Sequence, residues 1–189
     1  MSILTIPIIL GTTRKDNQSA QVAIHLQKRF HDIDNVEAPL LDLGLSDFPL
    51  LVDRVTEENP ITPMLAEWTS ILKNANGVII VSPEYKSGYP GSLKNFIDYL
   101  PPGIFRYKPI GISTVSSGIY AGTSCLQQLR QVVISMSGLV IPDRFQVGTV
   151  QSAFSPENEL ISAQLHKTCE KFITEMISYT HNLSQMQTG

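Results

Sequence analysis

The stretch Gly77-Val78-Ile79-Ile80-Val81-Ser82-Pro83-Glu84-Tyr85-Lys86-Ser87-Gly88-Tyr89-Pro90-Gly91-Ser92-Leu93-Lys94-Asn95 decides the fold. It begins with a continuous apolar run, which is typical of a strand buried on both faces of a parallel sheet. The run breaks into a loop rich in proline, glycine and tyrosine, and the chain then restarts as a predicted helix. Ligands of open parallel sheets bind outside the carboxyl ends of the strands, so this loop is suited to hold a flat ligand.

The bulk composition describes one globular domain. The chain has 189 residues, of which 42% are apolar, and a formal net charge of -3. No cluster of lysine or arginine stands out, so nucleic acid and anionic membranes are not expected as partners. No apolar run approaches the roughly 20 residues needed to cross a bilayer. Residues 1–10 read as a first buried strand rather than a leader, and we expect a cytoplasmic protein.

Apolar runs alternate with segments of helical periodicity along the whole chain. Strands are expected at 1–10, 36–43, 78–81, 109–115 and 139–150, the last interrupted at Pro142, and helices at 17–30, 64–75, 92–100, 122–136 and 155–179. This alternation predicts the α/β class: a flavodoxin-like three-layer sandwich with a five-stranded parallel sheet in the order 2-1-3-4-5. Residues 1–183 are expected to form a single domain and residues 184–189 a flexible tail.

The two cysteines do not point to chemistry of their own. Cys125 and Cys169 lie far apart in predicted helices, without C-x-x-C spacing or clustered histidines. A disulfide or a metal site is therefore not expected, and the favoured reading is a pair of buried structural thiols.

Residues 11–19, between the first strand and the first helix, have the composition of a phosphate-binding loop. Gly11 permits a tight turn, and hydroxyls with free N–H groups at a helix start can bind phosphate oxygens. Arg14 adds a positive charge. The loop lacks the P-loop and dinucleotide fingerprints, which favours a monophosphate. The alternative is a solvated loop in which Asp16 or Asn17 caps the helix.

The two loops together resemble the NAD(P)H-dependent FMN reductase family, which is flavodoxin-like and includes quinone, azo-dye and chromate reductases. Residues 83–95 are close to its Pro-Glu-Tyr-Asn-x-x-Tyr-Pro-Gly-x-Leu-Lys-Asn signature, and Thr12, Arg14 and Ser19 match its first loop. The resemblance implies that FMN is the cofactor. Its phosphate would be held by Thr12, Arg14, Gln18 and Ser19, with Thr13 contributing its N–H.

The same resemblance implies that five residues of the signature loop line the FMN: Pro83, Glu84, Tyr85, Lys86 and Ser87. Lys86 stands where the family usually has asparagine, and Ser87-Gly88 replaces the common Gly-Ser order. Substrate preference is open at this position, because a cation there can lie near the ring edge, face an incoming nicotinamide phosphate or point outward. Lys94 and Asn95 are interpreted as positioning or dimer-contact residues.

A third loop follows the strand at 109–115. Ser116-Ser117-Gly118, with Gly122 further on, matches the family's Ser-x-Gly-x-x-Gly. By resemblance, Ser116, Ser117 and Gly118 bring backbone N–H groups to the flavin pyrimidine edge. The alternative is an ordinary glycine-rich turn between a strand and a helix.

The expected function is that of an FMN-dependent oxidoreductase. It passes two electrons from NADPH or NADH through bound FMN to a small acceptor such as a quinone, flavin, azo compound or metal oxyanion, and no catalytic side chain is assigned. The alternative is a non-enzymatic electron carrier or redox-sensing module. The sequence does not choose between the two nucleotides, although Arg106 and Lys108 are candidates for a 2'-phosphate contact. Family resemblance implies a homodimer or homotetramer.

Overall fold

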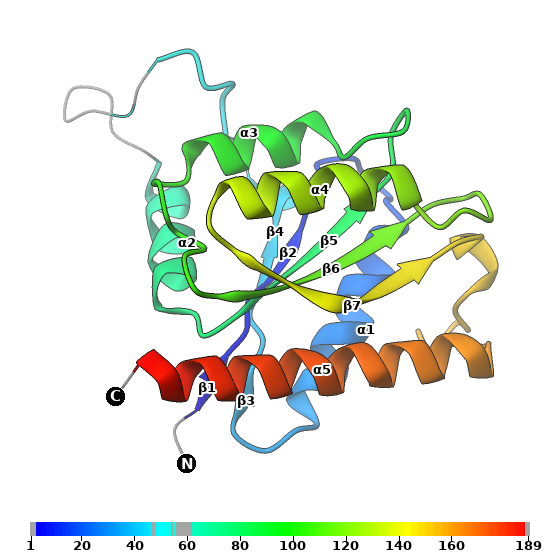
Figure 1. Cartoon of the computed structure of the whole chain (residues 1–189). Helices are drawn as coiled ribbons and strands as arrows, with labels where there is room; N and C mark the ends of the chain where they lie inside the picture. Colours follow the sequence, from blue (N-terminus) through cyan, green and yellow to red (C-terminus); the bar gives the residue numbers. More distant parts are fainter. Residues whose placement is uncertain (1–2, 47, 54, 56–61, 188–189) are drawn as a thin grey trace.

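The computed structural model describes residues 3–46, 48–53, 55 and 62–187 (Figure 1). The strands are β1 (Leu4–Thr5), β2 (Ile8–Leu10), β3 (Val36–Glu37), β4 (Leu40–Asp42), β5 (Val78–Pro83), β6 (Pro109–Val115) and β7 (Leu139–Val147). The α-helices are α1 (Ser19–His31), α2 (Pro63–Asn74), α3 (Gly91–Tyr99), α4 (Thr123–Ser135) and α5 (Ala163–Gln187). Two 3-10 helices, η1 (Leu43–Leu45) and η2 (Val150–Ser152), complete the described elements.

The main sheet has five parallel strands in the order β4-β2-β5-β6-β7. The predicted α/β class with a parallel sheet is therefore confirmed. The prediction of uninterrupted strands at 1–10 and 36–43 is wrong, because each breaks in two, and β1 pairs with β3 in a separate two-stranded sheet. The breaks fall at Pro7 and Pro39, and proline has no N–H to donate to a neighbouring strand.

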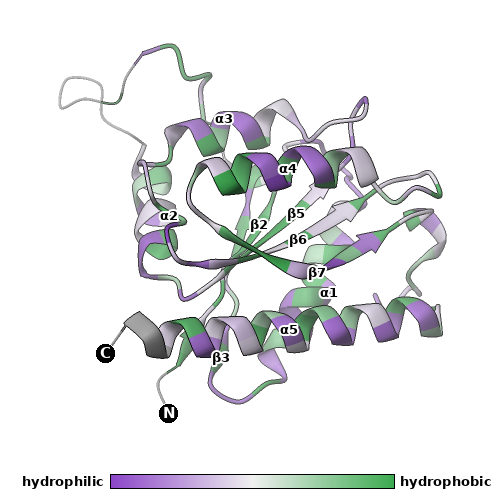
Figure 2. Cartoon of the chain, viewed as in Figure 1, coloured by the Kyte–Doolittle hydropathy of each residue, from purple (hydrophilic) through white to green (hydrophobic). Residues whose placement is uncertain are grey.

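Helices cover both faces of the sheet, and each face has its own core. Successive strand residues point to opposite faces, so Ile79 and Val81 join a core with α1 and α5, whereas Val78 and Ile80 join a core with α2, α3 and α4. Figure 2 shows hydrophobic residues along inner strands such as β5, whereas β7 and the helices alternate between hydrophobic and hydrophilic residues. This three-layer arrangement leaves the carboxyl edge of the sheet for the loops.

The C-terminal third differs most from the sequence prediction. β7 runs without interruption through Pro142, where its register against β6 shifts between Ile110 and Ile112. Because β7 is an edge strand, the missing N–H of Pro142 is tolerated there. α5 begins at Ala163 rather than at 155 and extends through Ser184 to Gln187. Residues 188–189 lie outside the described residues, and flexibility after residue 183 stays a prediction, as does the single domain 1–183.

None of the helices in the described part of the chain combines the length and apolarity that a membrane crossing requires.

Candidate functional site

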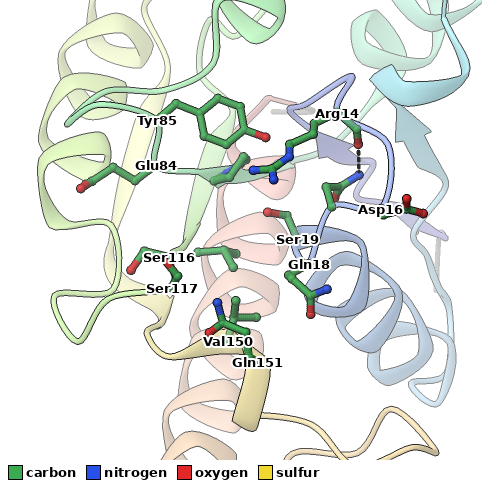
Figure 3. A pocket seen from close by; sticks show the side chains of 13 residues that line it. Arg14, Asp16, Gln18, Ser19, Glu84, Tyr85, Ser116, Ser117, Val150 and Gln151 are labelled. Carbon is green, nitrogen blue, oxygen red and sulfur yellow. Dashed lines mark hydrogen bonds between the residues drawn. The ribbon is translucent and has the colours of Figure 1, made fainter.

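The loops after β2, β5 and β6 converge at the carboxyl edge of the sheet, together with the segment after β7 (Figure 1). They enclose a cavity of about 440 Å³ (Figure 3). Its lining consists of Arg14, Asp16, Asn17, Gln18, Ser19, Pro83, Glu84, Tyr85, Val115, Ser116, Ser117, Val150 and Gln151. Three segments that the sequence marks separately thus form one site.

The predicted site residues divide into two groups. Those that line the cavity are Arg14, Gln18, Ser19, Pro83, Glu84, Tyr85, Ser116 and Ser117. Those that do not line it are Thr12, Thr13, Lys86, Ser87 and Gly118. The second group lies on the same three loops, and its role toward a ligand stays a prediction.

The loop after β2 turns sharply at Gly11. A Cβ there would lie 2.7 Å from Cδ2 of Leu93 and 3.2 Å from the carbonyl oxygen of Val81, so a side chain at this position would force Leu93 to move. Further along, Oδ1 of Asn17 accepts from the N–H of Ala20 at 2.9 Å, and its Nδ2 donates to the carbonyl of Arg14 at 2.9 Å. Asn17 rather than Asp16 therefore fixes the start of α1.

This helix start presents donors to the cavity. The first N–H groups of a helix have no intrahelical acceptor. Ser19, only 2% exposed, lines the cavity from the first turn of α1. In Figure 3 the side chain of Arg14 extends toward the space between Ser19 and Tyr85. A guanidinium, a hydroxyl and helix N-terminal N–H groups are the donor set that binds phosphate, so capping by Asn17 and anion binding are compatible here.

Thr12 forms contacts with both of the first two loops. It is 1% exposed, and its Oγ1 lies 2.9 Å from the Oη of Tyr85 and accepts from the N–H of Arg14 at 3.2 Å. Thr12 thus links the first loop to the second and shapes the backbone beside Arg14. Thr13 faces a second cavity of about 240 Å³, which Phe48 and Leu50 also line.

The loop after β5 forms a hairpin with a two-residue tip. Tyr85 donates its N–H to the carbonyl of Gly88 at 2.8 Å, and Gly88 donates back to Tyr85 at 3.1 Å. Lys86 and Ser87 form the tip with φ of 50° and 64° and are exposed to solvent. Gln128 of α4 donates from Nε2 to the carbonyl of Ser87 at 2.7 Å. The changed residue order therefore preserves the turn, and its tip lies outside the cavity.

Glu84 lies between the second and third loops. Its N–H donates to the carbonyl of Val115 at 2.9 Å, and its Oε2 accepts from the N–H of Cys125 at 3.0 Å. A carboxylate at this position is stabilised by the N-terminus of α4. Burial raises the pKa of the Cys125 thiol to about 11, so this thiol is protonated at neutral pH. Cys125 is a buried structural residue.

The third loop is held from two sides. Ser116 donates from Oγ to the carbonyl of Gly118 at 2.8 Å, and the same carbonyl accepts from the N–H of Thr149 at 3.2 Å. Gly122 has a φ of 74°, and a Cβ there would lie 2.8 Å from Cβ of Thr114. The carbonyl of Gly118 faces the segment after β7, while Ser116 and Ser117 reach the cavity.

Sequence reasoning misses Val150 and Gln151, which line the cavity after β7. A usable signal exists, because β7 is parallel to the other strands and its carboxyl end must lie at the same edge. The sequence prediction continues this strand to residue 150, whereas β7 ends at Val147, so Val150 and Gln151 are not recognised as loop residues. Residues 153–161 form a compact loop, closed by a bridge between Phe154 and Leu160.

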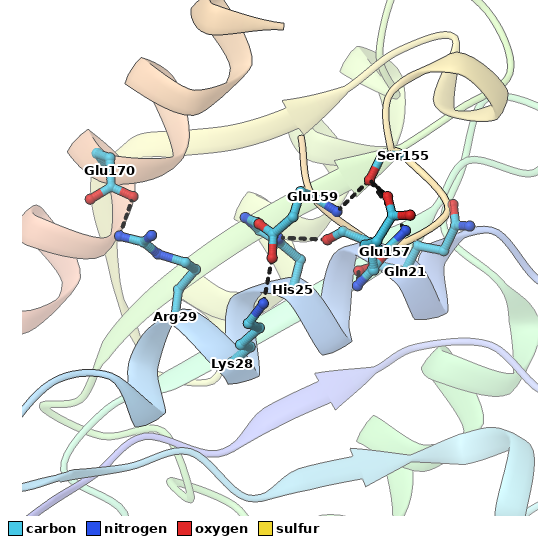
Figure 4. Close-up of polar contacts among 9 residues, drawn as sticks. Gln21, His25, Lys28, Arg29, Ser155, Glu157, Glu159 and Glu170 are labelled. Carbon is cyan, nitrogen blue, oxygen red and sulfur yellow. Dashed lines mark hydrogen bonds and ion pairs between the residues drawn. The ribbon is translucent and has the colours of Figure 1, made fainter. Parts of the chain in front are cut away.

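This compact loop docks on the buried side of α1 (Figure 4). His25, which is 1% exposed, donates from Nδ1 to the carbonyl of Asn158 at 3.1 Å. Its ring packs edge-to-face with that of Phe154, with the ring centroids 5.7 Å apart. Asn158 donates to the carbonyl of Gln21 at 3.1 Å, and Lys28 pairs with Glu159. Burial lowers the pKa of His25, so the neutral ring is favoured. The wall at Val150 is thereby connected to the helix that carries Ser19.

The suggested 2'-phosphate contacts at Arg106 and Lys108 are misplaced. Both precede β6, whereas the cavity lies beyond its carboxyl end, about 20 Å away for a strand of this length. Lys108 donates from Nζ to the carbonyls of Leu72 and Lys73, the latter at 2.7 Å. Partial burial lowers its pKa to about 8. Lys108 therefore stabilises the end of α2.

Comparison with known proteins agrees with this geometry. Residues 4–152 match the family described as NADPH-dependent FMN reductase. The chain is 31% identical over 158 residues to a quinone reductase of Escherichia coli (strain K12), covering 82% of each chain. It is 26% identical over 186 residues to an FMN-dependent NADPH-azoreductase of Staphylococcus aureus (strain USA300), covering 93% of this chain and 94% of the relative.

Solved structures show the same fold. The flavoenzyme NAD(P)H:(acceptor) oxidoreductase FerB from Paracoccus denitrificans superposes with a TM-score of 0.77 at 19% identity, covering 95% of this chain and 98% of FerB. An NADH:FMN oxidoreductase in its apo form gives a TM-score of 0.72 at 23% identity, covering 90% of this chain and 89% of that structure. With the family match spanning most of its length, the chain belongs to the NADPH-dependent FMN reductase family.

Proposed function

We propose that this protein is an FMN-dependent NAD(P)H oxidoreductase. It passes two electrons from a nicotinamide nucleotide through bound FMN to a small acceptor such as a quinone, flavin, azo compound or metal oxyanion. The observation that carries the proposal is the single cavity in which a phosphate-type donor set faces a rigid aromatic hairpin. The relatives named quinone reductase and azoreductase support the acceptor class.

The donor set at the α1 end fits the FMN phosphate. Arg14 supplies the charge, while Gln18, Ser19 and the N–H groups of the first turn supply hydrogen bonds. Thr13 contributes its N–H. Thr12 acts through the N–H of Arg14, which it holds in place.

The opposite end of the cavity fits the flat ring system. Pro83, Glu84 and Tyr85 form one side, and Ser116 and Ser117 form the other. Gly118 follows them on the same loop, and the family resemblance assigns its N–H to the ring. Pro83 is rigid, and the hairpin hydrogen bonds fix Tyr85 beside it. When bound, FMN supplies the electron transfer between nucleotide and acceptor. The protein binds and orients it, so we assign no catalytic side chain.

The proposal also includes the strand order, the assembly and the location of the protein. Counting β1 with β2 and β3 with β4 as interrupted strands gives the flavodoxin-like order 2-1-3-4-5, which the pairing of β4 with β2 supports. We also propose a cytoplasmic homodimer or homotetramer that binds neither nucleic acid nor membrane, in keeping with the net charge of -3. Analytical ultracentrifugation at micromolar concentration tests the assembly, and a monomeric mass would contradict the proposed homodimer or homotetramer.

Steady-state kinetics test the reaction. Nucleotide oxidation in the presence of a quinone should require FMN. Donor and acceptor variation should give parallel reciprocal plots, because both substrates use the one cavity in turn. Intersecting plots that demand a ternary complex would contradict a shared site, and oxidation at the same rate without FMN would contradict the cofactor.

A further inference from the structure

The hairpin tip beside the cavity is conformationally costly. Lys86 and Ser87 both have positive φ, 50° and 64°, in a two-residue turn between Tyr85 and Gly88. Such a turn favours Asn-Gly, because a Cβ in the left-handed region approaches the following carbonyl oxygen. An asparagine or glycine at 86 would fit the same backbone with less strain. Backbone strain at a residue beside a binding cavity motivates a functional hypothesis for its side chain.

The tip is also held rigidly. Both hydrogen bonds of the hairpin are formed, and Gln128 anchors the carbonyl of Ser87 to α4 at 2.7 Å. Gln128 also packs against Gly88, where a Cβ would lie 3.0 Å from its Oε1. Position 86 is therefore presented to solvent from a fixed backbone, with little entropy left to lose when a ligand binds.

The ammonium of Lys86 differs from those of several other surface lysines. Lys28, Lys94 and Lys171 each pair with a carboxylate, on Glu159, Asp98 and Asp143 respectively. Lys86 is exposed, and no residue within the described ranges forms an ion pair or hydrogen bond with its side chain. A positive charge that no internal partner satisfies is available to an anionic ligand.

The place of Lys86 relative to the two ends of the cavity indicates which anion it would bind. Arg14 and the start of α1 serve the phosphate end of the cavity, whereas Lys86 adjoins Tyr85 at the end assigned to the ring. Under the proposed function, substrates reach the ring from this end, and the nicotinamide donor brings phosphate groups with it. We propose that Lys86 is a specificity-determining residue that recognises the phosphate groups of the incoming nicotinamide nucleotide. This inference rests on the proposed function, because it assigns the donor to that same site.

Three variants separate charge from strain. Lys86→Ala removes the charge and keeps a Cβ in the left-handed region, Lys86→Asn removes the charge and relieves strain, and Lys86→Arg keeps both. KM for NADPH should rise about three- to tenfold in the first two, the range of an exposed charged contact, and stay near wild type in the third. The rise should shrink at high ionic strength, since salt screens exposed charges. Little change is expected in kcat.

Melting temperature reports the strain separately. Lys86→Asn should melt about 2 to 4 °C higher than Lys86→Ala, the shift expected for about 1 kcal/mol in a chain of this length. Ser137→Gly is a matched control, because Ser137 has a φ of 65° after α4, far along the chain from the hairpin. It should gain stability without changing KM. A KM that follows stability rather than charge would overturn the proposal.

An uncharged donor identifies the group that Lys86 recognises. With 1-benzyl-1,4-dihydronicotinamide, which has no phosphate, KM should be the same in Lys86→Ala and wild type. If the variant raises KM only for an anionic quinone sulfonate and not for NADPH, Lys86 reads the acceptor and the proposal fails. Unchanged KM for all substrates also overturns it. In either case, if NADPH reduces FMN bound to the wild type, the proposed function is still supported. If NADPH does not reduce it, both the proposed function and the role of Lys86 are contradicted.

Discussion

The hydroxyl oxygens of Thr12 and Tyr85 lie 2.9 Å apart and join the loop after β2 to the loop after β5. The two residues are 73 positions apart in the chain. Thr12 also accepts from the N–H of Arg14, so one buried hydroxyl connects the phosphate end of the cavity to its aromatic wall. The two loops form a single unit, and a change in one should affect ligand binding at the other.

Removing this hydrogen bond should weaken FMN binding. Tyr85→Phe keeps the ring but loses the bond to Thr12, and the FMN dissociation constant should rise about two- to tenfold, the value of one net hydrogen bond. Fluorescence titration measures it. Tyr89→Phe is the control, because Tyr89 belongs to the same loop and packs against the core. Equal affinities in the two variants would show that the Thr12 contact does not matter for binding.

Arg14→Ala should weaken FMN binding by about 1 to 3 kcal/mol, or roughly 5- to 150-fold, through loss of a charged phosphate contact. Lys15→Ala is the neighbouring control, since Lys15 is exposed and does not line the cavity. The same titration against riboflavin, which lacks the phosphate, should show no effect of Arg14→Ala. A comparable loss for riboflavin would indicate that Arg14 supports the loop rather than the phosphate.

His25 should give the protein a pH-dependent stability. Burial lowers its pKa in the folded state below the unfolded value of 6.5. The unfolded chain therefore binds the proton first, and stability from His25 is complete above about pH 6.5 and declines as pH falls toward the folded pKa. Glu159 and Arg29 act on the ring with opposite signs, and His166 also lowers the pKa.

Urea unfolding at pH 5 and pH 7.5 measures this effect. His25→Leu should lose part of the difference between the two pH values that the wild type shows. His31→Leu should retain it, because His31 is exposed at the end of the same helix. A His25→Leu variant with the full wild-type pH dependence would exclude this origin.

Asn95 should contribute to stability rather than to cofactor binding. Its Oδ1 accepts from the N–H of Leu51 at 2.9 Å and its Nδ2 donates to the carbonyl of Pro49 at 2.8 Å, so it holds the 49–51 segment on α3. Asn95→Ala should lower the free energy of unfolding by about 1 to 2 kcal/mol and leave FMN affinity unchanged. Lys94→Ala, which removes only a surface pair with Asp98, should cost less.

The sequence predicts the layers and the cavity well because local patterns determine them. The prediction of a strand at 109–115 matches β6 to the residue, and the apolar run 78–81 locates β5, which extends two residues further to Pro83. The edge strand β7 is harder, because Pro142 breaks the local pattern and only its place at the sheet edge makes it acceptable. The sequence prediction extends the last helix back to residue 155, whereas α5 begins at Ala163. The segment 153–161 forms a loop instead, and its position depends on a buried contact with His25 from another part of the chain.

Individual roles within the site are less predictable. Motif matching assigns Thr12 to the phosphate but does not predict that its hydroxyl bonds to Tyr85, a pairing that depends on the packing of two loops distant in sequence. Lys86 and Ser87 belong to the signature but form a hairpin tip outside the cavity. A motif identifies which loop serves a ligand, whereas the tertiary contacts decide which of its residues face that ligand.

An anaerobic absorbance experiment tests the central claim most directly. Purified protein loaded with FMN should show a perturbed flavin spectrum, and addition of NADPH or NADH should bleach it within the time of catalytic turnover. Bound FMN that neither nucleotide bleaches would contradict the reductase assignment and favour an electron carrier. Failure to bind FMN would contradict the assignment of the cavity itself.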